Sequence, residues 1–156
     1  MSMEFEARIA RAVGELPADQ WDALAGANPF LSHAFLTALE DSGSVGPGSG
    51  WDAVPITIAG TDGTIAAALP AYLKAHSQGE YVFDHAWADA WHRAGGSYYP
   101  KMQIAVPFTP ATGPRLLLAD PALAAPLLRA AEQVCEENGL SSAHADAPIA
   151  EGAGVA

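Results

Sequence analysis

The first residues of the chain alternate between apolar and charged side chains. Phe5, Ala7 and Ile9 are separated by Glu6 and Arg8. A period of two is typical of a β-strand with one solvated face. We therefore predict that the chain begins with a strand.

A second alternating region surrounds the turn sequence Gly-Thr-Asp-Gly at residues 60–63. The flanking residues 52–59 and 64–74 are predicted to be the two arms of an antiparallel hairpin. Pro55 and Pro70 have no backbone N–H to give to a ladder, so we expect them at edges, ends or bulges of these arms.

Three long stretches have the spacing of helices, and a fourth, shorter one covers residues 85–94. Trp21 shares a helical face with a leucine three residues later, and Gly26 is a suitable residue to end that helix. Ser32 is the candidate N-cap of the second helix. The third helix is predicted to begin near Asp120 and to end at the Asn-Gly pair of residues 138–139.

Residues 101–108 contain the most informative alternation. In a strand, the apolar side chains of one face and the polar side chains of the other are separated. The first face would carry Met102, Ile104, Val106 and Phe108, and the second Lys101, Gln103 and Ala105. We expect the second face to line a cleft or to meet solvent, and we expect strand pairing to stop near Pro107, which lacks an N–H. Residues 141–147 form one more predicted strand.

The predicted order of elements is strand, two helices, hairpin, short helix, strand, long helix, strand. This order indicates a mixed α/β (α+β) fold with a largely antiparallel central sheet and flanking helices. The length of 156 residues suits a single domain. We place that domain at residues 1–147 and expect residues 148–156 to be a frayed tail.

Composition narrows the function classes. Seven Lys+Arg against 18 Asp+Glu give a formal net charge of -11, which disfavours an electrostatic grip on DNA, RNA or an anionic membrane. The single cysteine, Cys135, excludes an internal disulfide and is expected in the core. We find no signal peptide and no apolar run long enough to span a bilayer, so a soluble, cytoplasmic protein is the simplest expectation.

Two neighbouring groups of residues are candidates for ligand binding. Tyr98, Tyr99 and Lys101 could bind a peptide-like or phosphate-bearing substrate, with Gln103 on the same strand face as Lys101. The loop that follows offers Thr109, Thr112, a flexible Gly113 and Arg115. Such loops at the C-terminal ends of strands often contact ligands. The alternative is an ordinary strand end and a surface connection.

Histidines and their acidic neighbours are the remaining candidates for a general base or a metal site. His144 and Asp146 would share one strand face, and a general-base role there competes with simple exposure. His85, Asp89 and His92 would share a helical face, but three ligands on one helix rarely close a tight metal site, so we expect no metal.

Several blocks of the chain together resemble the N-terminal part of the FemAB-like family of peptidoglycan biosynthesis or recognition proteins. The blocks are FLSHAFLTALEDSGSVG, LPAYLKAHSQGEYVFDHAWADAWHRAG, YYPKMQIAVPFTPATGPRLL and the GLSSAHA that follows the last helix. The resemblance spans roughly residues 28–144. It implies membership of the GNAT-like acyltransferases and an acyl-CoA N-acyltransferase fold that is incomplete at its C-terminus, because family members run longer.

The resemblance also implies an activity. It implies transfer of an acyl or aminoacyl group to an amine, such as that of a peptidoglycan precursor, at two strands that splay to admit the donor. Residues 102–108 and 141–147 would be those strands. The donor would be acetyl-CoA or another acyl-CoA, or aminoacyl-tRNA, since TPATGPRL does not match the pyrophosphate-binding turn of ordinary GNAT enzymes.

Two other hypotheses stay open. The chain could be a non-catalytic recognition module of the same fold that binds peptidoglycan-like fragments through residues 98–115. It could also be a half-domain whose open sheet edge pairs with a missing C-terminal half or with a second copy as a homodimer.

Overall fold

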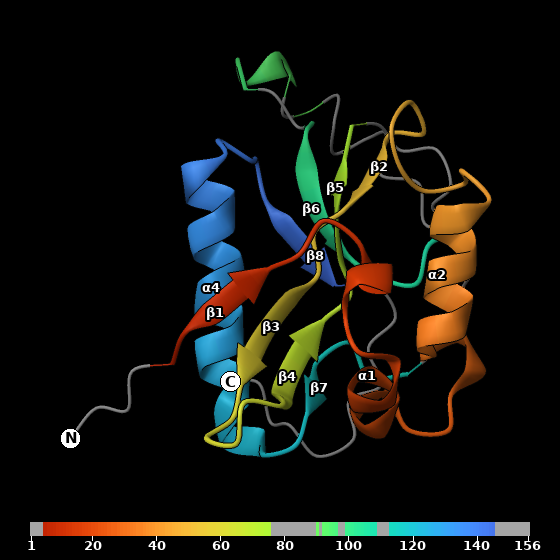
Figure 1. Cartoon of the computed structure of the whole chain (residues 1–156). Coiled ribbons are helices and arrows are strands. Elements are labelled where there is room, and N and C mark those ends of the chain that lie inside the picture. The colour runs from red at the N-terminus through yellow and green to blue at the C-terminus, as the bar shows by residue number, and fades with distance from the viewer. Residues whose placement is uncertain (1–4, 76–89, 91, 97–98, 109–112, 146–156) are drawn as a thin grey trace.

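The computed structural model of the chain describes residues 5–75, 90, 92–96, 99–108 and 113–145. These residues form helices and strands (Figure 1). In chain order they are β1 (Ala7–Ile9), α1 (Ala18–Ala25), α2 (His33–Asp41), β2 (Trp51–Ala53), β3 (Ile56–Ala59), β4 (Ile65–Leu69), β5 (Ala71–Lys74), β6 (Lys101–Ile104), β7 (Leu117–Leu118), α4 (Ala124–Glu137) and β8 (Ala143–Ala145). Single 3-10 turns occur at Val13–Glu15, Pro29–Leu31 and Pro121–Leu123.

One long hairpin organises the strands. Its first arm is β2 and β3, its second arm is β4 and β5, and each arm is interrupted at a proline. The carbonyl of Pro55 accepts a hydrogen bond from Ala10 N, and that of Pro70 accepts one from Ala105 N. The prolines therefore give an acceptor to a neighbouring segment while contributing no donor. This confirms the predicted hairpin and the expected position of its prolines at strand ends.

The interruptions divide the strands into two four-stranded sheets. The first has the order β1-β3-β4-β7 and the second the order β2-β5-β6-β8. Every pairing between these strands is antiparallel except that of β6 with β8, which α4 connects as a parallel crossover. The mixed α/β class with a mostly antiparallel arrangement is thus confirmed.

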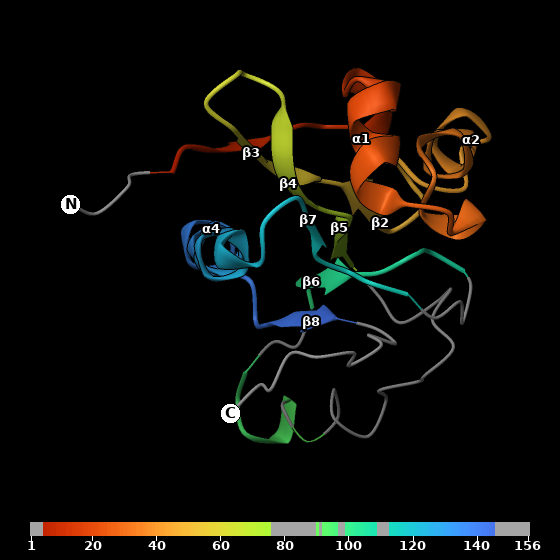
Figure 2. The ribbon, with the colours of Figure 1, turned by 90° about the horizontal axis from the view of Figure 1, so that it is seen from below.

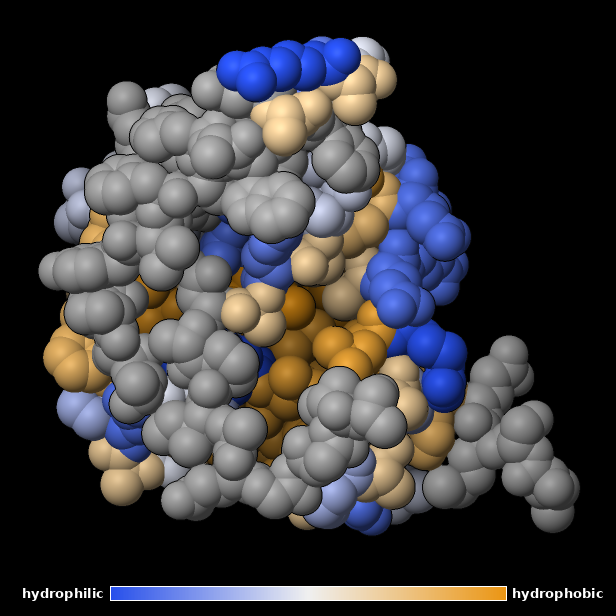
Figure 3. All heavy atoms as spheres, turned by 180° about the vertical axis from the view of Figure 1, so that it is seen from behind, coloured by the Kyte–Doolittle hydropathy of each residue, from blue (hydrophilic) through white to orange (hydrophobic). Residues whose placement is uncertain are grey.

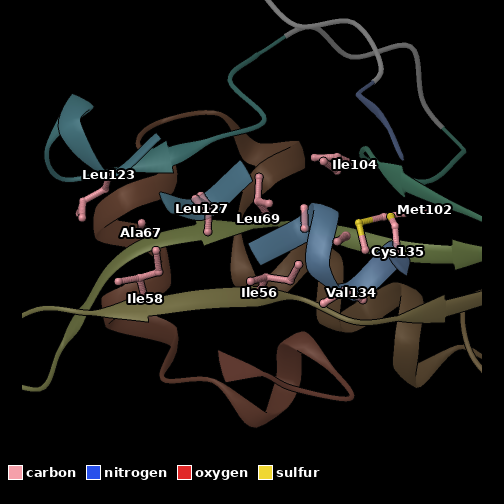
Figure 4. Close-up of a cluster of buried hydrophobic side chains, with 12 residues drawn as sticks. Ile56, Ile58, Ala67, Leu69, Met102, Ile104, Leu123, Leu127, Val134 and Cys135 are labelled. Carbon is pink, nitrogen blue, oxygen red and sulfur yellow. The ribbon is translucent and has the colours of Figure 1, made fainter. Parts of the chain in front are cut away.

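Helices lie on both sides of the strands, as Figures 1 and 2 show. On one side α4 packs on β3, β4 and β6 (Figure 4). The buried residues of this cluster are Ile56, Ile58, Ala67, Leu69, Ala71, Met102, Ile104, Leu123, Leu127, Ala131, Val134 and Cys135. On the other side α1 and α2 pack on β4 and β7. That cluster contains Val13, Trp21, Ala25, Leu31, Leu36, Ala68, Val106 and Leu117.

Local signals set the helix boundaries. α1 ends at Gly26, whose positive φ of 71° suits a residue without a Cβ. The Ser32 hydroxyl accepts a hydrogen bond from Phe35 N at 3.2 Å and so caps α2. The Asp120 side chain accepts from Ala122 N in the turn that leads into α4. These three boundary predictions are confirmed.

The strand predicted over residues 102–108 is shorter and more deeply buried than expected. β6 ends at Ile104, because the neighbouring Pro70 has no N–H with which to continue the ladder. Phe108 has a φ of 63°, outside the β region. Lys101 and Gln103 are 2% and 1% exposed, so the expectation that their face could meet solvent is wrong.

Two further expectations need correction. The first strand has no dry face, since all of β1 is exposed and the exposed fraction of Ile9 is 52%. β6 and β8 do not splay at Met102–Ile104 and Ala143–Ala145, where they pair in register. β8 lies at the edge of its sheet and is partly exposed. Figure 3 views the molecule from this side and shows apolar residues next to strongly polar ones.

Candidate functional site

One face of the second sheet carries an unusual set of polar and aromatic side chains. Strand pairing places Trp51, Lys74 and Lys101 in one cross-strand row. A second row contains Ala53, Tyr72, Gln103 and His144. Residues opposite each other on paired strands point to the same face, and so do residues two apart along a strand. We call Trp51, Tyr72, Lys74, Lys101, Gln103 and His144 the polar face.

Lys74 and Lys101 are the only lysines of the chain, and they are directly opposite each other on β5 and β6. Their exposed fractions are 0% and 2%. Like charges in opposite positions repel, and a buried ammonium loses its hydration. Two such residues would be unfavourable for a sheet that served only as a scaffold.

Aromatic rings stabilise these two charges. Lys74 Nζ lies 3.9 Å from the centre of the Trp51 ring, and Lys101 Nζ lies 5.5 Å from that of Tyr99. A cation over an aromatic face contributes about 2 kcal/mol where water is excluded. Each lysine makes additional interactions besides its ring contact. The polar face therefore brings together both lysines of a chain whose formal net charge is -11.

Trp51 joins this row to an aromatic wall. Its ring packs edge-on against Tyr72 at 5.6 Å between centroids and tilted against Phe108 at 5.4 Å. Val45 and Leu39 pack beside Trp51 and Tyr72. The segment after β6 thus reaches the polar face through Phe108, although Phe108 itself is 41% exposed.

The second row contains buried polar atoms without partners. Within the described part of the chain, Tyr72 Oη and Gln103 Oε1 have no hydrogen-bond partner, and both residues are 1% exposed. Burial raises the pKa of Tyr72 well above its ordinary value of 10.0, and the negative charge of Glu40 adds to the effect. Its hydroxyl is consequently protonated and able to donate at physiological pH.

His144 ends this row on β8. Its Nε2 lies 2.7 Å from the hydroxyl of Ser142, and its Cα partner on β6 is Gln103. The side chain of His144 is half-buried. The Ser142 contact orients the ring, and His144 makes a further interaction besides this one. An imidazole is the side chain best suited to take up and release a proton near neutral pH.

Only some of the predicted site residues lie at the polar face. Tyr99, Lys101, Gln103 and His144 belong to or border the polar face, so the structure brings them together. Tyr98, Thr109, Thr112 and Asp146 lie outside the described residues.

Gly113 and Arg115 pack against the connection between α1 and α2. A Cβ on Gly113 would lie 2.6 Å from Asn28 Nδ2 and 3.4 Å from Leu31 Cδ1. Arg115 Nη1 donates to the Gly113 carbonyl at 3.3 Å, and Arg115 is 2% exposed. Gly113 is therefore a close-packing residue rather than the flexible one that we expected.

Sequence reasoning missed three members of the polar face. Tyr72 and Lys74 are assigned only to the second arm of the predicted hairpin, residues 64–74, and Trp51 lies just before its first arm. One signal was available, because the only two lysines both fall at the ends of predicted strands. Their pairing depends on the register of β5 against β6, which no local pattern shows.

The described residues contain neither a candidate metal site nor a candidate membrane span. Within that part of the chain, no group of three or more His, Cys, Asp and Glu side chains is placed to hold a metal ion. No helix there is both long and apolar enough to cross a membrane. Of the predicted helical face, His85 and Asp89 lie outside the described residues, and His92 is exposed.

The two sheets with helices on both sides define a mixed α/β protein with an architecture consistent with an acyltransferase-like fold. The model of the FemAB-like family, described as peptidoglycan biosynthesis/recognition, matches residues 12–152. The chain therefore belongs to the FemAB-like family. No curated protein and no solved structure gave a significant match.

Proposed function

We propose that the chain is part of an N-acyltransferase that transfers an acyl or aminoacyl group to an amine of a peptidoglycan precursor. The observation that carries this proposal is the polar face, where Lys74, Lys101 and His144 meet beside a parallel strand pair. Family membership supplies the peptidoglycan context. The GNAT-like transfer of an acyl group is what we add to that context.

The reaction needs few components. The amine nitrogen attacks the acyl carbon, loses a proton, and displaces the thiol of CoA or the ribose hydroxyl of tRNA, which takes up a proton. A protein favours this step by holding the two groups together, accepting the amine proton and donating hydrogen bonds to the carbonyl oxygen. In our proposal the imidazole of His144 accepts the proton, and the Tyr72 hydroxyl is available as a donor.

The donor and the acceptor would occupy different parts of the sheet. Ligands of α/β proteins favour the C-terminal ends of parallel strands, and β6 and β8 are the parallel pair. We place the acyl donor, an acyl-CoA or an aminoacyl-tRNA, beyond Ile104 and Ala145. We place the acceptor on the polar face.

The test is a transfer assay with the full chain. Radiolabelled acetyl-CoA and a set of aminoacyl-tRNAs are offered separately, with soluble peptidoglycan precursors as acceptors. His144→Gln keeps a polar side chain of similar size next to Ser142 and should lower transfer by about 10²- to 10⁴-fold, the usual contribution of a general base. His92→Gln, at an exposed position, is the matched control and should leave transfer unchanged.

Two further measurements complete the test. Isothermal titration with acetyl-CoA, run beside thermal unfolding, shows whether binding raises the melting temperature. Absence of transfer from either kind of donor by a folded chain would contradict the proposal.

A non-catalytic recognition module is the second candidate. A bound ligand would satisfy the unpartnered atoms of Tyr72 and Gln103 without any reaction, and His144 already contacts Ser142. Precursor binding without transfer would favour this candidate.

A further inference from the structure

The two unpartnered atoms of the polar face need different hydrogen-bond partners. Gln103 Oε1 only accepts hydrogen bonds, so its partner must supply an N–H or an O–H. The protonated Tyr72 hydroxyl donates, so its partner must be an acceptor. Native proteins rarely leave such buried atoms unpaired without a reason. A ligand that offers a donor and an acceptor close together would satisfy both.

A peptide amide has this combination. Its N–H suits Gln103 Oε1 and its carbonyl suits the Tyr72 hydroxyl, while the two residues are direct neighbours across β5 and β6. The Cβ atoms of opposite residues in antiparallel strands lie about 5 Å apart, so the two side chains start from neighbouring positions on the polar face. The dianion of a phosphate monoester carries no O–H and so offers no donor for Gln103 Oε1, which makes it a poorer match for this row.

The lysine row lies one step away on the same face. Lys74 and Lys101 are each two residues from Tyr72 and Gln103, which corresponds to about 7 Å along a strand. An extended peptide advances by about 3.4 Å per residue, so its last two residues span this distance. A carboxylate at the lysine row would then place a preceding amide at the Tyr72 and Gln103 row.

We propose that the polar face binds the C-terminal end of an extended peptide, with the terminal carboxylate at Lys74 and Lys101 and an amide between Tyr72 and Gln103. This inference rests on the proposed function, because it identifies the peptide part of the acceptor. It requires only that the carboxylate adds to the interactions that the two lysines already make. Any ligand of this class has a terminal carboxylate and, next to it, a chain of peptide amides.

The probes are acetyl-Ala-Ala with a free carboxylate, the same dipeptide as its C-terminal amide, and inorganic pyrophosphate. Each is titrated into the full chain by calorimetry. We expect the free acid to bind at least tenfold more tightly than the amide, because a hydrogen bond to a charged group is worth about this factor or more. Pyrophosphate should bind more weakly than the free acid.

Variants separate the two rows. Tyr72→Phe and Gln103→Met remove the unpartnered atoms and should weaken binding of the free acid about five- to tenfold. They should leave the preference for the acid over the amide in place. Lys101→Met should abolish that preference. Thr57→Val removes a buried hydroxyl on β3, outside the polar face, and is the matched control that should keep both affinities.

The outcomes distinguish this inference from the proposed function. Equal affinity for acid and amide, no binding of either dipeptide, or tighter binding of pyrophosphate would overturn the inference. Transfer activity could survive each of those results, and the polar face would then serve the donor or remain structural. Binding of the free acid with the expected variant pattern, but without transfer to any precursor, would support the inference and contradict the acyltransferase.

Discussion

The two halves of the central hairpin differ in what they carry. In the half nearer the turn, Ile56, Ile58 and Leu69 are fully buried against α4, and Ala68 faces α1 and α2. In the half beyond the prolines, Tyr72 and Lys74 are equally buried but polar. The same two arms thus serve a two-sided apolar core at one end and the polar face at the other.

The prolines explain how one hairpin supports both roles. Each arm is interrupted once, at Pro55 and Pro70, and different strands pair with it on either side of the break. The apolar half is flanked by β1 and β7, and the polar half by β6 and β8. Burial of apolar area stabilises the first half, whereas the second half tolerates unpaired polar atoms. We infer that stability and ligand binding are divided along one hairpin.

The largest predicted effect tests the apolar half. Leu127 of α4 is fully buried against β3 and β4, so Leu127→Ala should lower the free energy of unfolding by about 2–5 kcal/mol through lost burial and a cavity. Chemical denaturation measures this change. The neighbouring Leu128 is 42% exposed, and Leu128→Ala should cost about 0.5 kcal/mol or less. Similar losses for both variants would show that the α4 side is not the stabilising core.

The next effect concerns the segment that follows the polar half. Gly113→Ala would bring a Cβ within 2.6 Å of Asn28 Nδ2 and 3.4 Å of Leu31 Cδ1, so these side chains must shift, and the φ of 151° at this position is itself unfavourable for alanine. We expect a loss of about 1–3 kcal/mol in the free energy of unfolding.

Gly63, in the hairpin turn, provides the matched comparison. Its φ of 83° is unfavourable for alanine, but nothing lies within 4 Å of the added Cβ. Gly63→Ala should therefore cost only about 1 kcal/mol. If Gly113→Ala proves the milder of the two, the close approach to Asn28 has no energetic importance.

The third prediction has the opposite sign. Gln103→Met replaces a buried acceptor that has no partner with an apolar group of similar size. The free energy of unfolding should stay the same or rise by about 1 kcal/mol, because the desolvation of Oε1 is no longer required. Thermal denaturation without ligand measures it. A clear loss of stability would mean that the polar face is a structural network rather than a binding surface.

Local features of the fold could be predicted from the sequence. The turn at residues 60–63, the helix end at Gly26 and the cap at Ser32 each depend on a few adjacent residues, and all three were found. The core position of Cys135 also followed from helical periodicity. Such features depend on short-range sterics and hydrogen bonds, which the sequence displays directly.

The candidate site could be predicted only in part. Lys101 and Gln103 were identified from strand alternation, but their burial was not, because alternation separates two faces without showing what covers them. Lys74 was missed because residues 75–100 separate it from Lys101 and only the register of β5 with β6 brings the two together. Register depends on the packing of the whole sheet.

The smallest effect is expected at the hairpin turn, farthest along the arms from the polar face. The Asp62 carboxylate accepts hydrogen bonds from Thr64 Oγ1 at 2.7 Å and from Thr64 N at 3.0 Å. Both hydrogen bonds lower the pKa of Asp62 below its ordinary value of 3.8, and the side-chain bond has the larger effect. A depressed pKa means that the folded state favours the ionised form.

This contribution to stability is present above the unfolded pKa of 3.8 and disappears as the pH falls through the lower folded value. Thr64→Val removes the hydroxyl and should move the pKa of Asp62 back towards 3.8, though not fully, since the backbone N–H still donates. An NMR titration of the Asp62 carboxyl carbon measures the shift. Thr61→Val, in the same turn, is the control. If the pKa of Asp62 is identical in the wild-type and Thr64→Val proteins, the Thr64 hydroxyl does not hold the turn. The turn would then lack a stabilising side-chain hydrogen bond, as the unpartnered atoms of the polar face do.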